Sequence, residues 1–342
     1  MSKKVLVTGG TGYIGSHTVV ELQNEGFEVI IVDDLSNSNI EVLDAIEKIS
    51  GQRPQFEKFN LAEREKTDAF FEKYNHIDAI IHFAAFKAVG ESVEKPLEYY
   101  RNNLVSLMNL LENMKRHNVP SLVFSSSCTV YGQPDQLPVT ESTPRKPAES
   151  PYGNTKAVSE DIMRDFSHAA EGLNCIALRY FNPIGAHPSA LIGEFPVGVP
   201  NNLVPFITQT AAGLRDELKI FGEDYDTPDG TAIRDYINVV DLAKAHVVAI
   251  NRLMEKKNKA AYEFFNVGTG NGYSVMQLVK TFMEVNGVEV KYQITDRRAG
   301  DIEKIWADTT LANEELGWKA EKTLEETLAS AWAWEKNVRN IK

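Results

Sequence analysis

A tyrosine and a lysine near the middle of the chain have the residue types and the spacing to move a proton together. Tyr152 and Lys156 lie in the segment Pro-Tyr-Gly-Asn-Thr-Lys, whose proline is typical of the first turn of a helix. Residues four apart on a helix share a face. We expect the lysine ammonium to favour the phenolate and to lower the pKa of Tyr152 from its ordinary value of about 10. The pair would then accept a proton from a substrate hydroxyl while a nearby cofactor takes hydride.

Three serines at 125–127 supply hydroxyls that could assist this pair. We predict that Ser127 hydrogen-bonds both the Tyr152 phenol and a substrate oxygen. Ser125 and Ser126 better fit the role of turn residues that satisfy the end of a buried strand. Because a tyrosine and a lysine at this spacing are common by chance, the prediction depends on a cofactor site elsewhere in the chain.

A glycine-rich turn near the N-terminus predicts that cofactor site. An apolar segment breaks into Gly9, Gly12 and Gly15, and a helical pattern follows. Glycines at such a junction let the backbone approach a pyrophosphate, and the helix N-terminus then faces the phosphates. The next apolar segment ends in Asp33, 18 residues beyond Gly15. A carboxylate there would bind the ribose hydroxyls of adenosine and repel a 2′-phosphate, so we predict NAD rather than NADP.

Composition limits the class of protein. The chain has 342 residues, 43% of them hydrophobic, which is enough to bury a sizeable core in one large or two ordinary domains. The net charge of −12 is spread without long blocks of one sign, which argues against nucleic acid or an acidic membrane surface as a partner. A strand pattern starts almost at the first residue and no long apolar stretch follows, so we expect a soluble, cytoplasmic protein. The two cysteines and seven histidines lack metal-ligand spacing, so no metal is expected.

Strand and helix signals alternate through the first half of the chain. Apolar segments typical of strands lie at 4–8, 28–33, 54–59, 77–83, 121–126 and 174–180. Helical patterns lie between them at 40–49, 63–74, 93–117 and 151–171. This alternation predicts an α/β fold with a doubly wound, parallel, Rossmann-like sheet. Ligands bind at the carboxyl ends of the strands in such a sheet, where Gly9, Asp33, Phe83 and the three serines lie.

Prolines and glycines become frequent at about residue 181. We therefore predict an NAD-binding domain of residues 1–180 and a second, smaller substrate-binding domain of residues 181–342. Segments of the second domain, such as 234–240, are expected to return to the sheet of the first. The helices at 93–117 and 151–171 carry apolar faces that should pack on the sheet, and a surplus apolar face could dimerise.

These motifs resemble the extended short-chain dehydrogenase/reductase family. The glycine turn, the segment His-Phe-Ala-Ala at 82–85, the serine strand end and the Tyr152/Lys156 pair carry the resemblance. More specific stretches resemble the members that epimerise UDP-hexoses at carbon 4, and they lie at 87–93, 95–100, 178–183, 185–189, 200–203 and 229–236. The resemblance implies a homodimeric isomerase that holds NAD tightly and binds a UDP-sugar. The sugar would be oxidised to a transient 4-keto form, turn over, and be reduced on its other face.

On the cofactor side, the resemblance implies contacts along the whole dinucleotide. Lys156 would hydrogen-bond the nicotinamide ribose beside Tyr152, and Phe181 would pack near the nicotinamide. The other implied contacts are Gly9, Gly12, Tyr13, Ile14 and Gly15 at the pyrophosphate, Asp33 and Asn37 at the adenosine, Asn60 with its neighbour Leu61 at the adenine, and Phe83, Ala84, Lys87 and Asn102 toward the nicotinamide. Asn60 is a departure, because the family pattern usually has an aspartate that accepts from the adenine amine. We expect the amide oxygen of Asn60 to accept in its place.

On the substrate side, the resemblance implies a firm grip on the UDP and a loose grip on the hexose, because the sugar must turn over. Ser127 and Tyr152 would contact the hexose. The residues implied to bind the nucleotide are Arg234 and Arg298 at phosphate or ribose, Asn182 and Asn202 as amide partners, Phe221 against uracil, and Asp301 at the ribose hydroxyls. Ile305 lies where the family's residue varies in size, so tolerance for N-acetylated sugars stays open.

Other functions share parts of this pattern. A nucleotide-sugar 4,6-dehydratase begins with the same oxidation, but it needs an Asp-Glu pair after the strand-end serine to eliminate water. Cys128 and Thr129 stand there instead, and neither can act as a carboxylate. Cys128 has no cationic neighbour in sequence, so we expect a small buried residue rather than a nucleophile. An outward dehydrogenase and an epimerase that prefers UDP-N-acetylhexosamines both stay open, whereas a non-catalytic NAD-sensing protein would not need Ser127, Tyr152 and Lys156 together.

Overall fold

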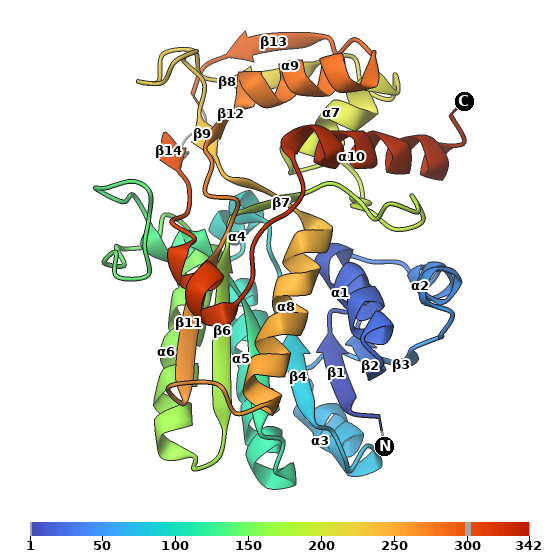
Figure 1. Ribbon diagram of the computed structural model, residues 1–342, viewed down its shortest axis with the longest axis vertical. Coiled ribbons are helices and arrows are strands. Elements are labelled where there is room, and N and C mark those ends of the chain that lie inside the picture. Colours follow the sequence, from blue (N-terminus) through green and yellow to red (C-terminus); the bar gives the residue numbers. More distant parts are fainter. Residues whose placement is uncertain (1, 298–301, 342) are drawn as a thin grey trace.

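A parallel sheet with helices on both faces forms the larger part of the molecule (Figure 1). The computed structural model describes residues 2–297 and 302–341. Within these residues the central sheet has seven parallel strands in the order β11-β6-β5-β4-β1-β2-β3. They are β1 (Lys4–Thr8), β2 (Glu28–Asp33), β3 (Gln55–Lys58), β4 (Ala79–His82), β5 (Ser121–Ser127), β6 (Asn174–Tyr180) and β11 (Tyr262–Val267). The strand order reverses beside β1, which confirms the predicted doubly wound fold.

Alternating side chains of the strands form two cores, one on each face of the sheet. Val5 and Val7 of β1 join one core, and Leu6 between them joins the other. The helices of this part are α1 (Tyr13–Asn24), α2 (Val42–Ser50), α3 (Arg64–Lys73), α4 (Val89–Glu94), α5 (Pro96–His117), α6 (Pro151–Ala169) and α8 (Val239–Met254). Residues of α1, α2 and α8 contribute to the first core, and residues of α3, α5 and α6 to the second.

The helix predicted at 93–117 is two helices. Lys95 ends α4 with φ −126° and ψ 51°, and Pro96 begins α5. A proline lacks the N–H that would continue the preceding helix, and it disfavours helical backbone in the residue before it. The chain therefore turns at Lys95, and α4 lies beside the cleft described below.

A second, smaller group of elements stands above the carboxyl ends of the sheet strands (Figure 1). Its helices are α7 (Leu203–Ala211), α9 (Val275–Asn286) and α10 (Leu324–Arg339), and they share a core that includes Ile207, Phe282 and Trp332. Its short strands are β7 (Asn182–Ile184) with β10 (Tyr236–Asn238), β8 (Leu218–Phe221) with β13 (Tyr292–Thr295), and β9 (Ile233–Arg234) between β12 (Tyr273–Ser274) and β14 (Lys304–Ile305). Two single turns complete the order, η1 (Cys128–Tyr131) and η2 (Ala312–Leu316).

The segment that returns to the central sheet differs from the one predicted. Residues 234–240 form β9, β10 and the start of α8, and none of these strands joins the central sheet. Instead β11 pairs with β6 along its whole length, and α8 packs against α1. The prediction was wrong because β9 and β10 are too short to show a strand period, whereas β11 was not recognised at all.

None of the helices in the described ranges, 2–297 and 302–341, combines the length and the apolar character needed to cross a membrane.

Candidate active site

One cleft runs along the carboxyl ends of the central strands and beneath the smaller group of elements. All of the site residues predicted above that the structure describes line this cleft, and so does Ile305. Arg298 and Asp301 lie outside the described residues. The fold therefore brings together positions from both halves of the chain, while the role of each residue stays a prediction.

The glycine turn after β1 forms a tight cradle at one side of the cleft. Gly9 has φ +69°, and a Cβ there would lie 2.8 Å from the backbone nitrogen of Ala84. A Cβ on Gly15 would lie 2.2 Å from the carbonyl oxygen of Gly9, so this glycine lets α1 pack against the turn. Gly12 caps α1 without a side chain that accepts from the first N–H groups. Those N–H groups and the helix dipole make the cradle fit an anion such as a pyrophosphate.

Asp33 stands beside the glycine turn as a largely buried carboxylate. Its Oδ2 accepts from the backbone nitrogen of Thr11 at 3.2 Å, and its Oδ1 accepts from that of Leu35 at 2.9 Å and from Ser38 Oγ at 3.2 Å. These donors fix the carboxylate at the end of β2, where the fold places the ribose of a dinucleotide. Both the cradle and this acid therefore fit NAD.

The strand β5 and the helix α6 carry the predicted proton-transfer groups. Ser150 caps α6 by accepting from the nitrogen of Gly153 at 3.2 Å, and Pro151 begins the helix as predicted. The Lys156 Nζ donates to the carbonyl oxygen of Ser125 at 2.5 Å. The Ser127 side chain lies close enough to the Tyr152 phenol to lower its pKa. Two successive turns of the helix therefore contact the last residues of the strand.

Burial dominates the protonation of these groups. It raises the pKa of the Tyr152 phenol above its usual value, and the nearby Ser127 side chain opposes the rise. Burial also lowers the pKa of Lys156 to about 7, although the Glu160 carboxylate acts in the opposite direction. The prediction that Lys156 lowers the pKa of Tyr152 is therefore wrong for the protein's own groups. The Lys156 amine lies 5.9 Å from the centre of the Tyr152 ring, and near neutral pH it holds its proton only part of the time.

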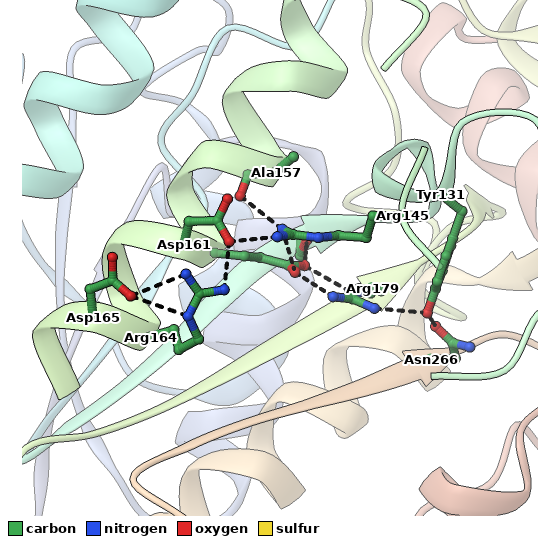
Figure 2. Close-up of polar contacts among 10 residues, drawn as sticks. Tyr131, Arg145, Ala157, Asp161, Arg164, Asp165, Arg179 and Asn266 are labelled. Carbon is green, nitrogen blue, oxygen red and sulfur yellow. Dashed lines mark hydrogen bonds and ion pairs between the residues drawn. The ribbon is translucent and has the colours of Figure 1, made fainter. Parts of the chain in front are cut away.

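A buried ion pair holds α6 against the sheet one turn beyond Lys156. Glu160 and Arg179 are 2% and 4% exposed, and the Arg179 guanidinium donates to both carboxylate oxygens of Glu160. Ser126 Oγ also donates to Glu160 at 2.5 Å. Figure 2 shows the Arg179 side chain beside Tyr131, to whose hydroxyl it donates at 3.0 Å. The network joins α6, β5, β6 and the turn after Ser127, so it positions the helix that carries Tyr152 and Lys156.

The opposite wall of the cleft carries the residues predicted to bind the nucleotide. Phe221 ends β8 with 42% of its surface exposed. Arg234 lies on β9, donates to the carbonyl oxygen of Ile233 at 2.8 Å, and acts electrostatically on Cys128. Asn182 lies on β7, and Asn202 is the residue before α7. These side chains come from short strands and loop ends rather than from the central sheet.

The residues after Ser127 bear on the dehydratase alternative. Burial raises the pKa of the Cys128 thiol to about 12, so it is a neutral thiol rather than a nucleophilic thiolate, as expected. Thr129 follows it in η1 and supplies a hydroxyl. Neither residue offers the carboxylate that elimination of water needs.

Sequence reasoning missed three acidic residues at this site. Asp34 and Glu194 line the cleft, and Glu160 lies behind it. Glu194 accepts from Asn202 Nδ2 at 2.6 Å and lies 3.6 Å from the Lys87 amine. It therefore links a residue predicted to bind the substrate, Asn202, to one predicted to bind the cofactor, Lys87. Glu160 had a usable signal, because it follows Tyr152 and Lys156 by further turns on the same helix face. Glu194 lies in a loop where no periodic pattern could indicate it.

Comparison with known proteins places this geometry in a family. A family model described as GDP-mannose 4,6 dehydratase matches residues 6–331. The UDP-glucose 4-epimerase of Bacillus subtilis is 50% identical over 339 residues, which are 99% of this chain and 98% of that protein.

Solved structures agree with this relation. The crystal structure of UDP-glucose-4-epimerase from Stenotrophomonas maltophila, with bound NAD and formylated UDP-arabinopyranose, has a TM-score of 0.95 and 45% identity, covering 99% of this chain and 100% of that one. The UDP-glucose 4-epimerase of Bifidobacterium longum in complex with NAD+ and UDP has a TM-score of 0.94 and 46% identity at the same coverage.

Proposed function

We propose a residue-level mechanism for this chain, which belongs to the UDP-glucose 4-epimerase family within the extended short-chain dehydrogenases/reductases. It is an isomerase that interconverts UDP-glucose and UDP-galactose with NAD. The observation that carries the mechanism is the contact of Tyr152 and Lys156 with the serine end of β5, inside the cleft that also contains the glycine cradle.

Tyr152 is the proposed acid and base. Its phenolate oxygen takes the proton of the sugar 4-hydroxyl and later returns a proton to the same oxygen. The Ser127 side chain lowers the pKa of the phenol, which favours the phenolate against the effect of burial. NAD held beside Tyr152 and Lys156 would supply the hydride acceptor and donor for the sugar C4, and its positive charge would favour the Tyr152 phenolate.

The two walls of the cleft divide the work of binding. We propose that Lys156 holds the nicotinamide ribose and that Asp33 holds the adenosine ribose. Asn182, Asn202, Phe221 and Arg234 hold the UDP from the opposite wall. Since these anchors surround the nucleotide, the hexose can turn about its bonds to the diphosphate and present its other face.

The assay that tests the function uses purified protein, NAD and UDP-galactose. We expect UDP-glucose to form without accumulation of free NADH. A 4-keto-6-deoxy sugar would instead identify a dehydratase, the activity after which the matching family model is described. Accumulation of NADH in proportion to substrate would identify an outward dehydrogenase. The side chains of Cys128 and Thr129 favour the epimerase.

The range of sugars depends on the wall around Ile305. This residue is 2% exposed and packs in a cluster with Cys128 and Phe181 beside the reacting groups. We propose that it limits, but does not abolish, the turnover of UDP-N-acetylgalactosamine. The same assay with both sugars tests this limit, and an Ile305→Ala variant should raise the relative rate with the N-acetylated sugar. An unchanged ratio would remove Ile305 from sugar selection.

We also propose the working form of the protein. Residues 1–180, with β11 and α8, make up the NAD-binding domain, and most of the remaining chain makes up the substrate-binding domain.

We propose a cytoplasmic homodimer formed through α5 and α6, because α5 leaves Leu97 74% exposed. Light scattering should give twice the chain mass, and Leu97→Asp should give monomers. Leu214→Asp is the matched control on another exposed leucine, and dissociation by both variants alike would contradict this interface.

A further inference from the structure

We infer that Asp34 accepts the 6-amino group of the adenine base, and that Asn60 holds Asp34 in place for this contact. The inference rests on the proposed use of NAD and names a specificity-determining residue for it. Asp34 directly follows the carboxylate predicted to bind ribose, and no role was predicted for it.

The position of Asp34 follows from the fold. With the pyrophosphate at the turn after β1 and the adenosine ribose at Asp33 after β2, we infer that the adenine lies one strand further along, near the ends of β2 and β3. Asp34, Asn60 and Asn102 line the cleft there, from the end of β2, the end of β3 and α5. Asp34 is half-buried, so its carboxylate is accessible from the cleft.

The hydrogen bonds of Asn60 orient its amide so that it does not present the acceptor predicted for it. Its Oδ1 accepts from the backbone nitrogen of Ala62 at 2.8 Å. Its Nδ2 donates to Asp34 Oδ2 at 2.9 Å and to Asn102 Oδ1 at 3.1 Å. Because the N–H of Ala62 requires an acceptor, the amide cannot be turned round without losing these bonds. Asn60 therefore presents donors to Asp34, and its oxygen faces the backbone.

Asp34 is the stronger acceptor of the two. Its Oδ1 accepts from the nitrogen of Ser36 at 2.9 Å, and its Oδ2 accepts from Asn60. Each carboxylate oxygen can accept a second hydrogen bond, and bonds to a charged acceptor are about twice as strong as neutral ones. A carboxylate here attracts the amine of adenine. It repels the carbonyl oxygen that hypoxanthine carries at the same ring position.

The test is a binding competition between NAD and nicotinamide hypoxanthine dinucleotide, which replaces the amine with that carbonyl. The protein is exchanged against an equimolar mixture, separated by gel filtration, and the retained dinucleotides are measured by chromatography. We expect the wild type to retain NAD over the analogue by about tenfold or more, the preference that one charged hydrogen bond provides. Asp34→Asn should bring the ratio to within about threefold of unity, because an amide can also donate.

The exchanged pair Asp34→Asn/Asn60→Asp sharpens the test. It reverses the hydrogen bond between the two side chains, keeps the acceptors for Ser36 and Ala62, and returns a carboxylate to the adenine end. We expect it to recover at least about half of the wild-type preference, whereas Asp135→Asn, an exposed partner of Lys146, should keep all of it. Melting temperatures check that each variant is folded.

Two results would overturn the inference. The Asp34→Asn variant could keep the wild-type ratio, and a changed ratio in Asn60→Ala would then return the acceptor role to Asn60. Alternatively, Asp34→Asn could lose both dinucleotides equally, which would place Asp34 on the ribose. Turnover of UDP-galactose by the wild type is measured in parallel. Its absence with the dinucleotide preference intact would count against the proposed function and leave the adenine contact standing.

Discussion

The two walls of the cleft are built in different ways. On the sheet side, Tyr152 and Lys156 lie on a 19-residue helix that is fastened to β5 and β6 by buried contacts. On the opposite side, Arg234 lies on a two-residue strand and Phe221 is 42% exposed. Proton transfer tolerates little displacement of the reacting atoms, whereas nucleotide anchors can adjust around a ligand that comes and goes. The difference shows why chemistry should depend on one wall and substrate affinity on the other.

The largest effect is expected from Tyr152→Phe, which removes the acid and base from the rigid wall. We expect kcat to fall by about 100- to 10,000-fold, while both ligands still bind. Steady-state assays and titration with UDP measure the two effects. Tyr100→Phe is the matched control, since that hydroxyl accepts from Asn154 outside the cleft and its loss should leave kcat within about twofold. Wild-type turnover in Tyr152→Phe would remove the phenol from the mechanism.

The next largest effect is expected from Glu160→Gln, which tests whether the buried ion pair with Arg179 holds α6 against the sheet. The substitution leaves the buried Arg179 charge without its counter-charge, and breaking such a pair costs about 3–5 kcal/mol of stability. Urea unfolding measures the loss. Glu112→Gln breaks the exposed pair with Arg64 and should cost less than about 1 kcal/mol. If the two variants lose similar stability, the buried network does not hold α6.

A smaller effect on a different quantity is expected from Phe221→Ala on the open wall. Loss of an aromatic surface against uracil should raise KM for UDP-galactose about tenfold and leave kcat nearly unchanged. The melting temperature should stay within about two degrees, because Phe221 is 42% exposed and lies on the surface of the cleft. A fall in kcat with an unchanged KM would contradict the assignment of catalysis to one wall and of substrate binding to the other.

The smallest effect is expected on stability from Lys156→Met, and its size depends on pH. The folded pKa of about 7 lies below the unfolded value of about 10.4, so the unfolded chain binds the extra proton between these values. The free-energy cost of burying Lys156 on folding is therefore largest at low pH, where the lysine is protonated in both states. We expect the variant, freed of dinucleotide, to melt a few degrees higher than the wild type at pH 6, with the gain fading toward pH 10. A gain that grows with pH would contradict the lowered pKa.

Sequence patterns located the site better than they described its electrostatics. The apolar strands ending at Thr8, Asp33 and Ser127 were predicted because each has enough residues to show a pattern, and the parallel sheet then brings their ends together. The short strands that carry Arg234 and Ile305 have no period to recognise. The sign of the Tyr152 pKa shift was also out of reach, because it depends on burial by residues distant in sequence.

In the proposed reaction one hydride leaves the sugar C4 and returns to the same carbon, while Tyr152 transfers only the proton. UDP-galactose carrying deuterium at C4 tests this most directly, with the UDP-glucose product analysed by mass spectrometry and NMR. We expect the product to keep its deuterium at C4 and to gain none there when unlabelled substrate reacts in D₂O. Loss of the label to solvent would contradict it, because the hydrogen would then have left C4 as a proton.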